Sequence, residues 1–184
     1  MNFELDISIL RFIHHNRIVA LDPWLYGLSF ITTYVSVGIV LSILIVSLVK
    51  KSRPLRVIFF KMLAVLIIGA LVSLSLKTMI VRDRPFITYP DIEKLSEAGS
   101  SSFPSGHTIE VFAMAMALSL LIPKRQVVIP VFAWAFLVAY SRMALGVHYP
   151  GDVAGGILIG ICTGWSVPVL ISKALKEKPP GNPA

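Results

Sequence analysis

Five long apolar runs limit what this chain can fold into. They cover residues 24–49, 57–76, 107–122, 127–145 and 153–171. A helix needs about 20 mainly apolar residues to cross a hydrocarbon core roughly 30 Å thick. The chain is 55% hydrophobic with a mean hydropathy of +0.79, which is outside the range of soluble domains. We therefore predict an all-α integral membrane bundle of about five transmembrane helices over residues 24–172, within a single domain of residues 1–184.

The segments outside these runs have a different character. Residues 2–18 combine apolar side chains at Ile7, Leu10 and Ile13 with several ionisable ones, which makes the segment too polar to span a bilayer. We expect residues 1–20 to form an amphipathic helix that lies in the membrane interface. Residues 173–184 follow the last run and begin with several lysines, so we expect a cytoplasmic tail.

The distribution of basic residues predicts the orientation of the bundle. Links 50–56 and 123–125 and the tail are rich in Lys and Arg, and five spans place them on one side, which the positive-inside rule makes cytoplasmic. The polar loop 82–104 and the turn at His148 then face the periplasm or the exterior, as do Arg11 and Arg17, against the rule. The formal net charge of +7 is divided among short clusters, which favours membrane anchoring and argues against a nucleic-acid partner.

Three polar clusters meet at the predicted outer face. Lys77 ends the second run and Arg84 lies seven residues later, so a helix continuing to Pro85 would point both cations the same way. Ser105 and Gly106 precede the third run, where unpaired N–H groups at a helix N-terminus favour an anion.

The third cluster contains Arg142, His148 and Asp152 around a Pro-Gly turn. A carboxylate near a histidine can accept one ring N–H and stabilise positive charge on the imidazole. Arg142 adds a planar donor fork that suits a phosphate or a carboxylate. This cluster therefore has the residue types of a base or nucleophile beside an anion site.

Each residue alone has a simpler interpretation. Lys77 alone is more often a snorkelling residue and Arg84 a headgroup anchor, while a lone histidine at the interface is as often structural as catalytic. Ser105 alone is most often a helix start, and Asp152 alone a charge at a helix N-terminus. On one face the sequence combines two histidines, three cations and a carboxylate, namely His107, His148, Lys77, Arg84, Arg142 and Asp152. This combination has no evident packing purpose and indicates a functional site.

The order and spacing of these residues resemble the three-part signature of the type 2 phosphatidic acid phosphatase family. The matching positions are Lys77 and, after six residues, Arg84-Pro85; Pro104-Ser105-Gly106-His107; and Ser141-Arg142, five residues, His148, three residues and Asp152. The resemblance implies a helical membrane enzyme that removes phosphate from lipid phosphates or pyrophosphates without a metal or other cofactor. Candidate substrates are phosphatidylglycerophosphate, undecaprenyl pyrophosphate and lipid A phosphates, in a bacterial cytoplasmic membrane.

The resemblance also implies a role for each site residue. His148 is the nucleophile that forms a phosphohistidine, Asp152 holds its opposite nitrogen, and His107 is the general acid and later the base. The phosphoryl oxygens are held by Lys77, Arg84, Ser105, Gly106 and Arg142. Two alternatives stay open: a phosphotransferase that uses the same site with a lipid acceptor, and a non-enzymatic lipid or anion transporter, against which the missing inverted repeat argues. The sequence does not predict the oligomeric state.

Overall fold

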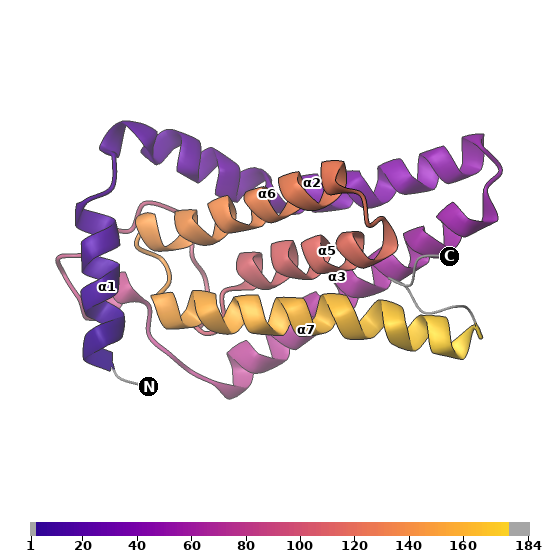
Figure 1. The fold of residues 1–184 in the computed structure, drawn as a ribbon. Coiled ribbons are helices and arrows are strands. Elements are labelled where there is room, and N and C mark those ends of the chain that lie inside the picture. The colour runs from indigo at the N-terminus through magenta and orange to yellow at the C-terminus, as the bar shows by residue number, and fades with distance from the viewer. Residues whose placement is uncertain (1–2, 177–184) are drawn as a thin grey trace.

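The computed structural model describes residues 3–176, and this part of the chain folds entirely into helices, turns and loops (Figure 1). The predicted all-α class is thus confirmed. In chain order the elements are α1 (Phe3–His15), η1 (Val19–Leu21), α2 (Asp22–Val49), α3 (Arg53–Met79), α4 (Pro85–Thr88), α5 (Gly106–Leu121), α6 (Arg125–Ala144) and α7 (Pro150–Ala174). Residues 1–2 of the expected interfacial helix and residues 177–184 of the expected tail lie outside the described residues.

The five predicted spans correspond to α2, α3, α5, α6 and α7. Among the described residues, four helical segments are long and apolar enough to cross a membrane, namely Val19–Val49, Arg53–Met79, Arg125–Ala144 and Pro150–Ala174. Helix α5 is apolar but has 16 residues, about 24 Å at 1.5 Å per residue. It packs against α2, α3, α6 and α7, and Figure 1 shows it between α6 and α7. Its neighbours cover it, so α5 is the central helix of the bundle.

Close packing of α5 on α7 depends on glycine. A Cβ atom at Gly160 would lie 2.7 Å from the carbonyl oxygen of Ile109, and one at Gly164 would lie 2.3 Å from that of Ala113. Small residues allow two helix backbones to approach in this way within a membrane. At the end of the same contact, the Ser105 N–H donates to the Asp152 carbonyl at 3.2 Å, so the packing aligns the first turns of the two helices.

Helix α1 crosses the end of the bundle at which α6 connects to α7 (Figure 1). It buries Ile7 and Leu10 and exposes Phe12, so it is amphipathic as predicted; its position in a membrane interface stays a prediction. It also buries two ionisable residues, Asp6 and His14. His14 donates from Nδ1 to the Ala144 carbonyl at 2.9 Å, and its Nε2 accepts from the Glu93 N–H at 3.1 Å. These contacts fix α1 to α6 and to the long loop.

The expectation that α3 continues through Arg84 is wrong. Helix α3 ends at Met79, and Arg84 has an extended conformation with φ −79° and ψ 155°. Pro85 accounts for the extended backbone at Arg84, because its ring disfavours a helical conformation at the preceding residue. Pro85 begins the short helix α4 and does not end α3. Lys77 and Arg84 therefore reach the site from a helix and from a loop, respectively.

Candidate active site

His148 lies in the short connection between α6 and α7 and is almost fully buried. The backbone N–H groups of Val147 and His148 both donate to the Arg142 carbonyl at 3.2 Å, which folds the connection back onto α6. Gly146 makes this possible because its φ of +72° lies in the left-handed region, and a Cβ there would be 2.3 Å from the Glu93 carbonyl oxygen. The imidazole is therefore held by a tightly constrained turn.

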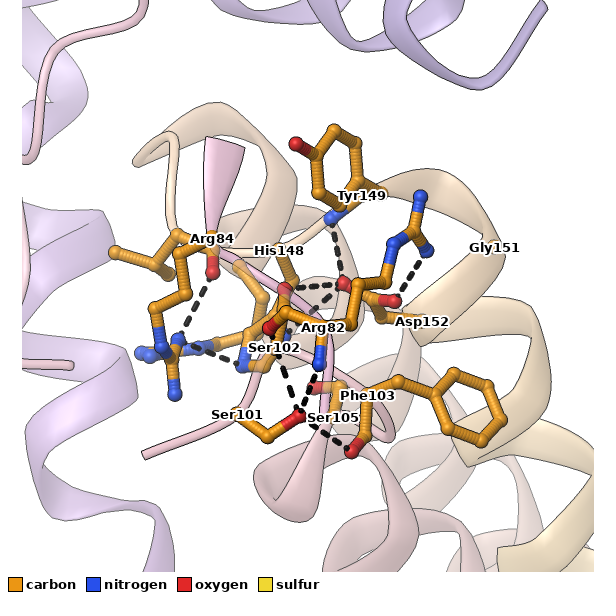
Figure 2. Close-up of polar contacts among 12 residues, drawn as sticks. Arg82, Arg84, Ser101, Ser102, Phe103, Ser105, His148, Tyr149, Gly151 and Asp152 are labelled. Atoms are coloured by element: carbon orange, nitrogen blue, oxygen red, sulfur yellow. Dashed lines mark hydrogen bonds and ion pairs between the residues drawn. The ribbon is translucent and has the colours of Figure 1, made fainter. Parts of the chain in front are cut away.

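The two ring nitrogens of His148 face different groups (Figure 2). Nε2 lies 3.4 Å from Nη1 of Arg84, and Nδ1 lies 3.6 Å from Oδ2 of Asp152. A guanidinium can only donate, so Nε2 is the accepting nitrogen and the ring proton belongs on Nδ1, toward the carboxylate. The latter separation is longer than a hydrogen bond but within the range of an ion pair.

The surroundings of His148 keep its imidazole neutral. Burial lowers the pKa of His148 to about 3; Asp152 opposes this shift, whereas Arg142 and Arg84 add to it. A neutral imidazole has a free lone pair on Nε2 at any pH near neutrality. The side chain is thus in the protonation state that a nucleophile requires.

Asp152 is fully buried in the first turn of α7, and its carboxylate has partners at both oxygens (Figure 2). Oδ2 accepts from the Ser102 hydroxyl at 2.5 Å and from the Tyr149 N–H at 3.0 Å. Oδ1 accepts from Nη1 of Arg82 at 2.5 Å. Charge-assisted hydrogen bonds of this kind fix both the ionised state and the orientation of a carboxylate.

Loop 96–101 holds the three predicted cations through backbone oxygens. Lys77 Nζ donates to the Ser101 carbonyl at 2.7 Å, and Arg84 Nε donates to the Ser100 carbonyl at 2.9 Å. Arg142 donates to the Glu97 carbonyl at 3.4 Å and to the hydroxyl of Ser29 on α2. Neutral partners leave the positive charges uncompensated, so these side chains remain available to attract an anion.

A cavity of about 670 Å³ opens beside these groups. Six of the eight predicted site residues line it: Lys77, Arg84, Gly106, His107, Arg142 and His148. The lining also follows α3 from Leu63 to Lys77, a distance of about 21 Å at 1.5 Å per residue. Lys77 is in the last turn of α3, so the cavity is charged at that end, and the α3 residues that line it from Leu63 to Leu74 are apolar apart from Ser73.

The other two predicted residues lie outside the lining. Asp152 Oδ2 lies 3.6 Å from Nδ1 of His148, and its role as an orienting group stays a prediction. The hydroxyl of Ser105 is paired with that of Thr108 at 2.8 Å. Its binding to a phosphoryl oxygen stays a prediction.

Sequence reasoning missed three residues at this site: Arg82, Ser102 and Asp6. Arg82 lies between Lys77 and Arg84, whose spacing belongs to the family signature, and Ser102 lies in a run of serines, so neither residue stands out in the sequence. Asp6 lies on a helix that was expected to contact the membrane, and its contact with Gly151 near the start of α7 at 2.7 Å has no local signal.

Residues 58–176 match the sequence model of the PAP2 superfamily, which is more than half of the chain. The chain belongs to the PAP2 superfamily. The family that the motifs predicted is thereby confirmed, and so is the prediction that the protein is a phosphatase.

Individual relatives agree with this assignment. The chain is 28% identical over 165 residues to undecaprenyl-diphosphatase BcrC of Bacillus subtilis, a match that covers 90% of this chain and 81% of that one. It superposes on a transmembrane PAP2-type phosphatidylglycerolphosphate phosphatase from Bacillus subtilis with a TM-score of 0.78 and 25% identity, covering 94% and 88% of the two chains. It also superposes on the crystal structure of Aquifex aeolicus LpxE with a TM-score of 0.74 and 29% identity, covering 92% of this chain and 95% of that one. The multi-pass helical membrane fold is thus shared with solved structures of the family.

Proposed function

We propose that this protein hydrolyses membrane lipid phosphates or pyrophosphates through a phosphohistidine at His148. The observation that carries the proposal is the cavity, which combines His148, His107 and three cations at one end with a long apolar wall. A phosphate fits the charged end, and an acyl or prenyl chain fits the apolar part.

In the first step, His148 Nε2 attacks phosphorus and forms a P–N bond while the bond to the lipid oxygen breaks. The Nδ1–H group of His148 donates a hydrogen bond to Asp152, whose negative charge stabilises the positive charge that develops on the ring. His107 protonates the leaving lipid oxygen. Lys77, Arg84 and Arg142 neutralise the equatorial oxygens of the transition state, a task that Mg²⁺ performs in many phosphoryl transferases.

In the second step, His107, now neutral, takes a proton from a water molecule that attacks the phosphohistidine. The P–N bond breaks and its electron pair returns to Nε2, so the imidazole is restored and inorganic phosphate leaves. In this mechanism the Gly106 N–H holds a phosphoryl oxygen during both steps, and its position at the N-terminus of α5 supports that role.

The relatives support a substrate among isoprenoid diphosphates, glycerolipid phosphates and lipid A phosphates, since their names include an undecaprenyl-diphosphatase, a phosphatidylglycerolphosphate phosphatase and a lipid A 4'-phosphatase. We place the site at the periplasmic or outer face of a bacterial cytoplasmic membrane. The α2–α3 and α5–α6 links and the end of α7 lie at the opposite end of the bundle from α1 (Figure 1), and these links carry the basic residues. Arg11 and Arg17, the outer-side exceptions, form ion pairs with Asp91 and Asp22.

The test is phosphate release by the purified full-length protein in detergent from a panel of lipid phosphates and diphosphates. We expect release that EDTA leaves unchanged and that His148→Ala abolishes. His15→Ala is the matched control because His15 is exposed on α1. A requirement for added Mg²⁺ would sink the metal-free mechanism, and full activity of His148→Ala would sink the covalent one.

A further inference from the structure

We infer that Arg82 and Asp6 are positioning residues for the proposed reaction, because together they set the orientation and the charge of Asp152. The inference rests on the proposed function, in which Asp152 orients the His148 nucleophile. It also gives α1 a role in catalysis, since Asp6 belongs to that helix.

Arg82 bridges two carboxylates. Its Nη1 donates to Oδ1 of Asp152 at 2.5 Å, and its Nη2 donates to Oδ2 of Asp6 at 2.6 Å (Figure 2 shows the first contact). The guanidinium also lies over the Tyr149 ring, 3.9 Å from its centroid. With side-chain exposures of 13% for Arg82 and 7% for Asp6, solvent screens this bridge weakly.

The backbone of Arg82 is fixed as well. Its N–H donates to the Ser101 hydroxyl at 3.0 Å, and its carbonyl accepts from the Ser102 N–H at 2.8 Å. Ser102 in turn donates from its hydroxyl to Oδ2 of Asp152. One loop pairing therefore brings two donors to the two oxygens of the same carboxylate, and this sets its plane relative to His148.

Asp6 connects the bridge to the start of α7. Its Oδ1 accepts from the Gly151 N–H at 2.7 Å, which is one of the unpaired donors in the first turn of that helix. Asp152 is in the same turn. Asp6 thus holds the helix end that carries Asp152 and, through Arg82, the carboxylate itself.

The charges of the bridge explain why a second acid is needed. A guanidinium paired with Asp152 alone would cancel the negative charge that has to stabilise the developing imidazolium of His148. Asp6 supplies another negative charge, so Asp6, Arg82 and Asp152 together keep a net charge of minus one. Burial opposes the charged form of Arg82, but the contacts with Asp6 and Asp152 outweigh it and raise the pKa of Arg82, so the guanidinium stays charged.

Arg82 and Asp6 are absent from the residues that line the cavity. They act on the substrate only through Asp152 and His148. A change at either residue should therefore lower kcat and leave KM almost unchanged, whereas loss of a phosphate-binding cation should raise KM.

The experiment measures kcat and KM for phosphate release from dioctanoyl phosphatidic acid by the full-length protein in detergent. The single variants are Asp6→Asn, Arg82→Gln and Arg82→Lys. The double variant combines Asp6→Asn with Arg82→Gln. Asp91→Asn is the matched control, because it removes an exposed ion pair between α1 and the same loop without reaching Asp152. Thermal unfolding of each variant identifies any loss of folding.

We expect Asp6→Asn and Arg82→Gln each to lower kcat about tenfold or more, with KM changed less than about twofold, because each removes a hydrogen bond between charged groups. Arg82→Lys should recover part of the loss. The double variant should be no more than about twofold slower than Arg82→Gln, since the two residues act as a unit. Asp91→Asn should match the wild type.

Three results would overturn the inference. The first is a loss of kcat in the double variant equal to the product of the two single losses. The others are a rise in KM with kcat intact, and an unchanged kcat in both single variants. If Asp6→Asn does not fold, the Arg82→Lys variant decides. The inference is overturned if Arg82→Lys unfolds at the same midpoint as the wild type but has a kcat as low as that of Arg82→Gln. Failure of the proposed function looks different: the wild type releases no phosphate, or His148→Ala retains activity. In that case the positioning assignment falls with it.

Discussion

Ser102→Ala tests whether the orientation of Asp152 controls the reaction. The substitution removes the hydroxyl that donates to Asp152 Oδ2 at 2.5 Å, and both residues are fully buried. The Tyr149 N–H stays at 3.0 Å from the same oxygen, so the carboxylate keeps one partner there. The change therefore weakens the hold on Asp152 without removing it.

The expected magnitude follows from the type of hydrogen bond. A hydrogen bond to a charged group contributes about 1.5–3 kcal/mol. If the whole contribution is realised in the transition state, kcat falls about 10- to 150-fold, since about 1.4 kcal/mol corresponds to a factor of ten. KM should change little because Ser102 is not part of the cavity lining.

The assay is steady-state phosphate release over a range of substrate concentrations, with Ser119→Ala as control. Ser119 donates to the Ala115 carbonyl within α5, so its loss is chemically similar but remote from Asp152. Unchanged kcat in Ser102→Ala, or a loss confined to KM, would refute the reasoning.

Two further predictions concern stability, measured as the midpoint of thermal unfolding in detergent. Gly164→Ala should lower the midpoint, because the added Cβ lies 2.3 Å from the Ala113 carbonyl and overpacking typically costs about 1–3 kcal/mol; Gly38→Ala in α2, where a Cβ meets nothing within 4 Å, should not, and equal midpoints would count against the close α5–α7 packing. Burial lowers the pKa of His14 in the folded protein below its unfolded value of about 6.5. The contribution of neutral His14 to the free energy of unfolding is therefore fully present above pH 6.5 and is lost as the pH falls toward the folded pKa. The midpoint should drop from pH 7 to pH 5, less steeply in His14→Gln, and an identical slope in both proteins would contradict this.

The sequence predicted the bundle and most of the site because both depend on local signals. Apolar runs mark the spans, and the Pro-Gly turn before Asp152 marks the start of α7 where the structure has it. Positively charged links then predict which polar clusters share a face, so His107 and His148 could be brought together without coordinates. Both line one cavity in the structure.

The remainder could not be predicted because it depends on tertiary contacts. The extended backbone at Arg84 follows from Pro85, and the sequence alone does not decide whether a proline ends one helix or begins the next. The contact between Asp6 and Arg82 joins residues that are 76 positions apart, and no periodicity relates an acid on α1 to a carboxylate on α7. Contacts of this kind emerge only when the helices are packed.

The most direct test of the account is detection of phosphate on His148 during turnover. The protein would be mixed with excess lipid phosphate, denatured in alkali, where phosphohistidine survives, and digested for mass spectrometry. We predict phosphate on the peptide that contains His148 in the wild type, and no such peptide in His148→Asn. Turnover without a phosphorylated His148 peptide, or phosphate attached to a different residue, would contradict the central claim.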